Sequence, residues 1–116
     1  MKICQVIDLV NVGGAGIAAK RISNVLSNHY GHDLVEISSS PSKSNFINYT
    51  LQNSRKLQLL SLFPRFSRNH YFKKFCSVDI NQQFKRILEI EKPNSINFHN
   101  IHSASWSIDL VKTALN

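Results

Sequence analysis

Residues 2–37 decide the fold and read KICQVIDLVNVGGAGIAAKRISNVLSNHYGHDLVEI. The β-prone run 2–7 leads into a turn that contains three of the four glycines in the chain, Gly13, Gly14 and Gly16. A helical pattern over about 15–28 ends near Gly31, and residues 33–37 are again β-prone. Because a strand, a glycine-rich turn, a helix and a second strand make a βαβ unit, we expect two parallel strands joined by a right-handed crossover.

These elements carry predictions about burial. The first strand lacks alternation of polar and apolar residues, which favours burial on both faces, with Cys4 inside. One face of the helix carries Ala18, Ile22, Val25 and Leu26 at helical spacing. We expect that face to contact the sheet.

The remainder of the chain continues the alternation of helices and strands. Leucines over 57–62 indicate an amphipathic helix that ends at Pro64, and Asp79 is the expected N-cap of a helix that stops before Pro93. Residues 95–99 are a third expected strand, and 108–115 form a final helix. This order predicts an α/β fold with a Rossmann-like parallel sheet and flanking helices. Three strands make an incomplete sheet, because such sheets usually have about five or more.

Length and composition indicate one domain over residues 1–116. The net charge is +7, and residues 43–78 hold seven basic residues and no acidic one. Such a charge favours a nucleic acid, an anionic membrane surface or a phosphorylated substrate as partner. The two cysteines lack metal-binding spacing and are expected to be reduced thiols of a cytosolic protein. Asp8 interrupts the one run that imitates a signal peptide.

The glycine-rich turn is a candidate anion site. Without a Cβ, Gly13, Gly14 and Gly16 let the backbone approach a ligand closely. The free N–H groups and the dipole of the following helix attract a phosphate. The alternative is that the glycines only make a tight connection, and the turn alone does not separate the two.

A second candidate is the sequence His99-Asn100-Ile101-His102, which follows the strand 95–99. The carboxyl ends of parallel strands meet at one edge of a sheet, so these residues should converge with the glycine-rich turn. Together they offer hydrogen-bond donors, acceptors and groups that titrate near neutrality. The alternative is that His99 is a packed residue at the strand end and that His102 caps a neighbouring loop. Without an acidic third ligand nearby, the pair His99 and His102 predicts no metal site.

Residues 1–37, taken with KPNSINFHNIHSASWSIDLV at 92–111, resemble the amino-terminal domain of glycosyltransferase family 4 enzymes of the bacterial polysaccharide type. That family has the two-domain GT-B fold, and the resemblance covers roughly 1–37 and 80–115. It implies transfer of a sugar from a nucleotide sugar to a polysaccharide or lipid-linked acceptor, with no further cofactor and no metal. By the same resemblance, Gly13, Gly14 and Gly16 would face the donor phosphates. His99, Asn100 and His102 would line the cleft at the acceptor and the transferred sugar.

The sequence departs from the family pattern in two ways. Four positions around the histidines differ, which changes sugar-facing contacts: Asn94, Asn97, Ser103 and Ala104. The chain also stops before the remaining amino-terminal strands and before the carboxy-terminal domain with its donor-binding glutamates. We therefore expect a truncated or split glycosyltransferase that is inactive alone, with a separate chain as one source of the donor domain.

The basic and aromatic segment 43–78 has three interpretations. The family context favours a membrane surface or a lipid-linked acceptor, in a cytoplasmic protein that is peripheral at the inner face of the membrane. Nucleic-acid binding is less favoured because no recognised motif is present. A solvated face with ordinary packing is the third interpretation. The candidate contact residues are Arg55, Lys56, Arg65, Arg68, Lys73 and Lys74.

Two other functions remain open. Gly14-x-Gly16-x-x-Ala19, followed by Glu36, satisfies a dinucleotide-binding pattern. Five residues separate the strand from the first glycine, whereas that pattern places the glycine at the strand end. The other open function is a non-catalytic interaction or nucleic-acid-binding fragment.

Overall fold

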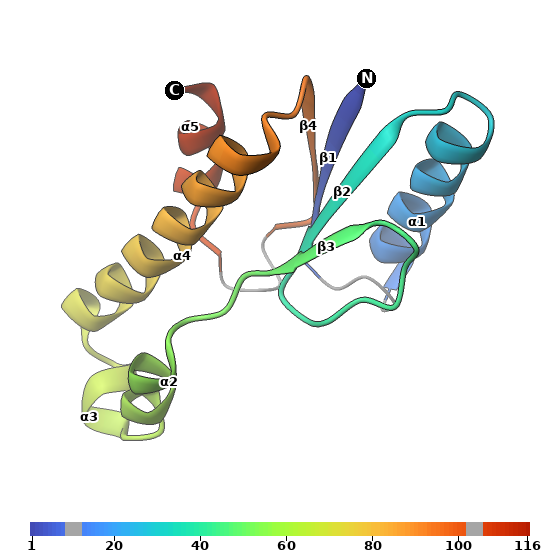
Figure 1. Ribbon diagram of the computed structural model, residues 1–116. Helices are drawn as coiled ribbons and strands as arrows, with labels where there is room; N and C mark the ends of the chain where they lie inside the picture. Colours follow the sequence, from blue (N-terminus) through green and yellow to red (C-terminus); the bar gives the residue numbers. More distant parts are fainter. Residues whose placement is uncertain (9–12, 102–105) are drawn as a thin grey trace.

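The computed structural model describes residues 1–8, 13–101 and 106–116 (Figure 1). Four strands and five helices follow one another in the described chain. Their order is β1 (Lys2–Ile7), α1 (Gly13–Asn28), β2 (Asp33–Ser38), β3 (Ile47–Thr50), α2 (Arg55–Ser61), α3 (Pro64–Ser67), α4 (His70–Glu91), β4 (Ser95–His99) and α5 (Asp109–Leu115).

The strands form one sheet in the order β3-β2-β1-β4, and all three neighbouring pairs are parallel. The predicted α/β fold with a Rossmann-like parallel sheet is therefore confirmed. The sheet has one strand more than the three predicted, because β3 lies between the second expected strand and the leucine-rich helix, where we predicted no strand. This strand has four residues, and three of them are exposed, so it lacks the apolar run that marks a buried strand.

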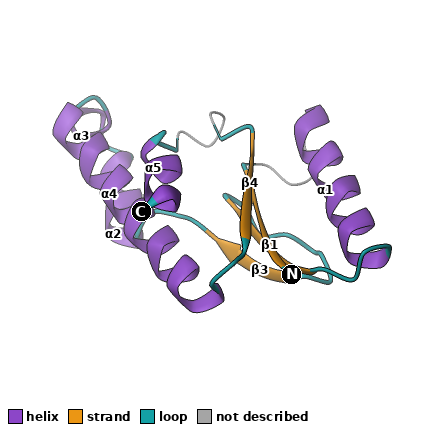
Figure 2. Cartoon of the chain, turned by 90° about the horizontal axis from the view of Figure 1, so that it is seen from above, coloured by secondary structure: helices purple, strands orange, loops and turns teal. Residues whose placement is uncertain are grey.

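Helices cover both faces of the sheet. Figure 2 shows α1 on one side of the strands and α4 with α5 on the other. The larger core lies on the side of α4, where Cys4 and Val6 of β1 meet Phe84 and Leu110. On the α1 side, Ile7 packs with Ala19. The prediction that β1 is buried on both faces, with Cys4 inside, is confirmed.

The predicted buried face of α1 is wrong. The helix buries Gly16, Ala19 and Ser23, whereas Ile22 and Val25 are 44% and 46% exposed. Small side chains let the helix backbone lie close to the sheet. The larger apolar residues, which would normally mark the buried face, are turned away.

The start of α4 also differs from the prediction. The helix begins nine residues before Asp79, and its N-cap is Asn69, whose Oδ1 accepts from Tyr71 N at 2.8 Å. Asp79 lies inside the helix, where its Oδ2 accepts from the backbone N–H of Ser54 at 2.8 Å. The predicted stop before Pro93 is confirmed, since α4 ends at Glu91. Across the described ranges, we find no helix with the length and apolar character needed to cross a membrane.

Candidate functional site

The candidate site is the carboxyl-terminal edge of the sheet, where α1 begins and where β2, β3 and β4 end. In open α/β sheets, ligands bind outside this edge. Ile7 pairs in register with His99, so β1 and β4 end side by side. Ser39, just after β2, donates its backbone N–H to the carbonyl oxygen of Asp8 at 3.1 Å, which joins the ends of β1 and β2. Strand order thus brings the start of α1 and His99 to one edge.

The predicted glycines occupy the first turn of α1 and do not form a loop before it. Gly13 has a φ of +74°, a conformation that favours glycine, and both Gly13 and Gly14 are exposed. A Cβ built on either residue has no neighbouring atom within 4 Å among the described residues. Gly16 is buried with the residues that pack α1 on the sheet. Gly13 and Gly14 therefore present open backbone at a helix N-terminus, and phosphate binding there stays a prediction.

His99 is the described member of the predicted histidine pair; His102 lies outside the described residues. The Nε2 atom of His99 is 2.6 Å from Oε1 of Gln5. An amide oxygen only accepts, so Nε2 donates and Nδ1 is left as an acceptor. Burial lowers the pKa of His99, which keeps the ring neutral near pH 7. Next to it, Asn100 adopts a left-handed φ of 44°, which asparagine tolerates better than most residues.

A buried polar row crosses the sheet beneath α1. Gln5 lies in register with Glu36 on one side and with Asn97 on the other. Gln5 and Glu36 are 1% and 3% exposed, and Nε2 of Gln5 and Oε1 of Glu36 have no hydrogen-bond partner within the described structure. We did not predict this row from the sequence, although polar residues inside two apolar strands indicate it. Glu36 also lies inside β2, away from the edge, which counts against its use as a dinucleotide ribose ligand.

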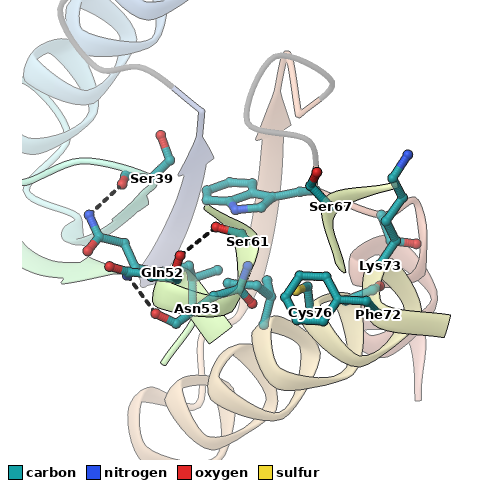
Figure 3. Close-up of a pocket in the computed structure, with 14 residues that line it drawn as sticks. Ser39, Gln52, Asn53, Ser61, Ser67, Phe72, Lys73 and Cys76 are labelled. Carbon is teal, nitrogen blue, oxygen red and sulfur yellow. Dashed lines mark hydrogen bonds between the residues drawn. The ribbon is translucent and has the colours of Figure 1, made fainter. Parts of the chain in front are cut away.

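A pocket of about 660 Å³ opens at this edge on the α4 side of the sheet (Figure 3). It is assembled from the ends of β2 and β3, from α2 and α3, from the first turns of α4, and from the chain that precedes α5. No sequence motif predicts this pocket, because its lining residues are far apart in the sequence. The lining residues are Ser39, Leu51, Gln52, Asn53, Gln58, Ser61, Ser67, Phe72, Lys73, Cys76, Ser77, Ile80, Trp106 and Ser107.

The pocket combines neutral polar side chains with a larger share of apolar surface that includes two aromatic rings. Hydroxyls and carboxamides line it together with Phe72 and Trp106, and Lys73 is its charged residue. Some polar groups are already held in place, since Nε2 of Gln52 donates to the carbonyl of Ser39 at 3.1 Å and Nε2 of Gln58 donates to the carbonyl of Asn53 at 2.6 Å. Many hydroxyl and amide groups beside aromatic surface suit a polyhydroxylated ligand.

The cysteines differ in environment. Burial raises the pKa of the Cys4 thiol to about 12. Cys76 is half-buried at the pocket, and burial also raises its pKa, so neither thiol is an activated nucleophile. Within the described ranges, no three histidine, cysteine or acidic side chains gather closely enough to hold a metal.

The predicted basic contact residues are all exposed. Arg55 and Lys56 belong to α2, Arg65 to α3, and Lys73 and Lys74 to α4, while Arg68 directly follows α3. Lys73 therefore belongs both to the basic segment and to the pocket.

No protein-family model, curated protein or solved structure matches this chain.

Proposed function

We propose that this chain is the acceptor side of a glycosyltransferase, which transfers a sugar from a nucleotide sugar to a saccharide or lipid-linked acceptor. The observation that carries the proposal is the pocket at the carboxyl-terminal edge of the sheet. Its volume of about 660 Å³ lies within the range of about 300–1,000 Å³ that is usual for small-molecule sites. Its hydroxyls and carboxamides match the hydrogen-bonding groups of a sugar, and Trp106 and Phe72 can cover the apolar face of a sugar ring.

We also propose that the chain contacts the nucleotide-sugar donor. Glycosyl transfer needs positive potential at the leaving diphosphate and an acceptor hydroxyl held in line with the sugar. The N-terminus of α1, with open backbone at Gly13 and Gly14, supplies the first requirement. A neutral His99 at the end of β4, at the same edge of the sheet, supplies a hydrogen-bond acceptor. In the family that the sequence resembles, a second domain binds most of the donor, so the proposal gives this chain the acceptor role.

Trp106 provides a direct test, because it is the single tryptophan of the chain and lines the pocket. We expect its fluorescence to change on titration with a panel of mono-, di- and oligosaccharides. The double variant Gln58→Ala/Ser61→Ala should weaken the best ligand about tenfold, since each lost hydrogen bond is worth about 0.5–1.5 kcal/mol. Gln82→Ala is the matched control, because Gln82 is an exposed amide of α4 outside the pocket lining. If none of the saccharides changes the fluorescence, the proposal is contradicted.

The donor is tested separately with Gly14→Val. A Cβ added at Gly14 meets no described atom within 4 Å beyond its chain neighbours and its own helix, so we expect the fold to tolerate valine while the approach of a phosphate is blocked. We expect binding of a nucleotide sugar, measured by calorimetry, to weaken about tenfold or more in the variant. If wild type and Gly14→Val bind the nucleotide sugar with equal affinity, α1 is not part of the donor site.

A further inference from the structure

Helices α2 and α3 and the first turns of α4 form a surface that we call the basic tip, residues 55–78. Neither α2 nor α3 contains a buried residue. α2 packs on α3, and α3 packs on the start of α4. Figure 1 shows this part at the outer end of α4, away from the strands. A helix as short as α2, with seven residues, is marginal in water without tertiary support.

The basic tip exposes large apolar side chains. Leu62 is 76% exposed and Phe63 59%, between α2 and α3, while Tyr71 and Phe75 on α4 are 74% and 66% exposed. Tyr71, Phe75 and Val78 recur at helical spacing, so they form a stripe along α4. Phe72 and Cys76 of the same helix line the pocket instead. Exposed apolar side chains that gather in one part of a surface indicate an interaction site.

The charge of the basic tip restricts what can dock there. Six basic residues lie within 55–74, all of them exposed, and the whole segment 43–78 contains no acidic residue. The next acidic residue, Asp79, is half-buried and accepts a hydrogen bond from Ser54. The partner must therefore be anionic and must also accept inserted leucine and phenylalanine side chains.

We propose that the basic tip docks onto the surface of an anionic lipid bilayer. Basic side chains interleaved with leucine and aromatic residues place cations at the head groups and apolar groups just beneath them. A single-stranded nucleic acid would use the aromatic rings for stacking but would leave the aliphatic Leu59 and Leu62 in water. Ser61, Ser67 and Lys73 belong both to the basic tip and to the pocket, so docking places the pocket next to the bilayer. This inference rests on exposure and charge and does not depend on the proposed function.

The test is co-sedimentation of the full chain with vesicles of phosphatidylcholine alone or mixed with phosphatidylglycerol. We expect binding only to the anionic vesicles, and weaker binding as added salt screens the charges. Arg65→Gln/Arg68→Gln should lower the partition coefficient about 25-fold, at about fivefold for each lost charge. Leu62→Ser/Phe63→Ser should lower it about tenfold or more, because the inserted apolar groups are lost.

Matched controls lie on the remainder of α4. Lys85→Gln/Arg86→Gln removes two exposed charges beyond the basic tip, and Ile90→Ser removes an apolar side chain that is 68% exposed. Both controls should bind anionic vesicles like wild type, and urea midpoints should show that every variant is folded. The proposal is overturned if anionic vesicles do not bind, if the charge control loses as much binding as Arg65→Gln/Arg68→Gln, or if Leu62→Ser/Phe63→Ser binds normally. Binding to single-stranded RNA in place of vesicles would also overturn it.

Discussion

The hydrogen bond from Tyr49 to Glu91 connects the edge strand β3 to the end of α4, and we expect its removal to destabilise the fold. The hydroxyl of Tyr49 donates to Oε1 of Glu91, and Oε2 of Glu91 lies 3.0 Å from Nζ of Lys2 on β1. The carboxylate is 9% exposed. Tyr49→Phe keeps the aromatic ring and leaves this buried carboxylate with one described partner instead of two.

The expected loss follows from these contacts. A hydrogen bond to a charged group contributes about 1.5–3 kcal/mol, and we take the lower end, about 1.5 kcal/mol, because Lys2 still pairs with the carboxylate. For a domain of this size, about 1 kcal/mol shifts the midpoint of thermal unfolding by about 4 °C, so the variant should melt about 6 °C lower. The measurement is urea and thermal unfolding followed by far-ultraviolet circular dichroism at pH 7.

The same bond has a pH dependence with a defined sign. The hydrogen bond from Tyr49, followed by that from Lys2, lowers the pKa of Glu91 in the folded state. A lowered pKa stabilises the fold above the unfolded pKa of about 4.3, and this stabilisation is lost as the pH falls through the folded pKa. The difference between wild type and Tyr49→Phe should therefore shrink as the pH falls below about 4. Tyr71→Phe, on a tyrosine that is 74% exposed, is the control and should change stability by less than about 0.5 kcal/mol. The reasoning is refuted if Tyr49→Phe lowers the free energy of unfolding by no more than about 0.5 kcal/mol, or if the loss does not depend on pH.

Three further predictions concern the glycines, the core and the thiols. Gly13→Ala should lower the free energy of unfolding by about 1 kcal/mol because Gly13 has a positive φ. Gly14→Ala should change the free energy of unfolding by less than about 0.5 kcal/mol. Urea unfolding of both variants tests this difference. Phe84→Ala should cost about 3–5 kcal/mol, since Phe84 is fully buried against both sheet and helix, and a loss below about 2 kcal/mol in the same assay would contradict that packing. In the native protein a thiol reagent should modify Cys76, whereas Cys4 should react only after urea unfolds the chain. A saccharide in the pocket should slow the reaction of Cys76. Equal reaction rates of the two thiols would be inconsistent with their different burial.

The candidate site was predictable where it depends on strand ends. Parallel strands place their carboxyl ends at one edge, so the glycines at the start of α1 and His99 at the end of β4 could be assigned to the same edge from sequence order. The pocket could not be assigned in this way. Its lining comes from segments between Ser39 and Ser107, and a patterned motif cannot indicate contacts across such distances. The buried row of Gln5 and Glu36 had a signal in the sequence, but only strand register shows that the two residues lie side by side.

The class of this fold follows from the sequence because the signals that specify it are local. The apolar run of β1, the stop at Gly31, and the prolines after α2 and α4 act on the residues next to them. Which face of α1 is buried depends on its packing against the sheet. Gly16, Ala19 and Ser23 face the sheet because close approach of the helix needs small side chains, whereas the larger Ile22 and Val25 stay outside. The early start of α4 and the pairing of β3 with the sheet also depend on contacts with residues far along the chain.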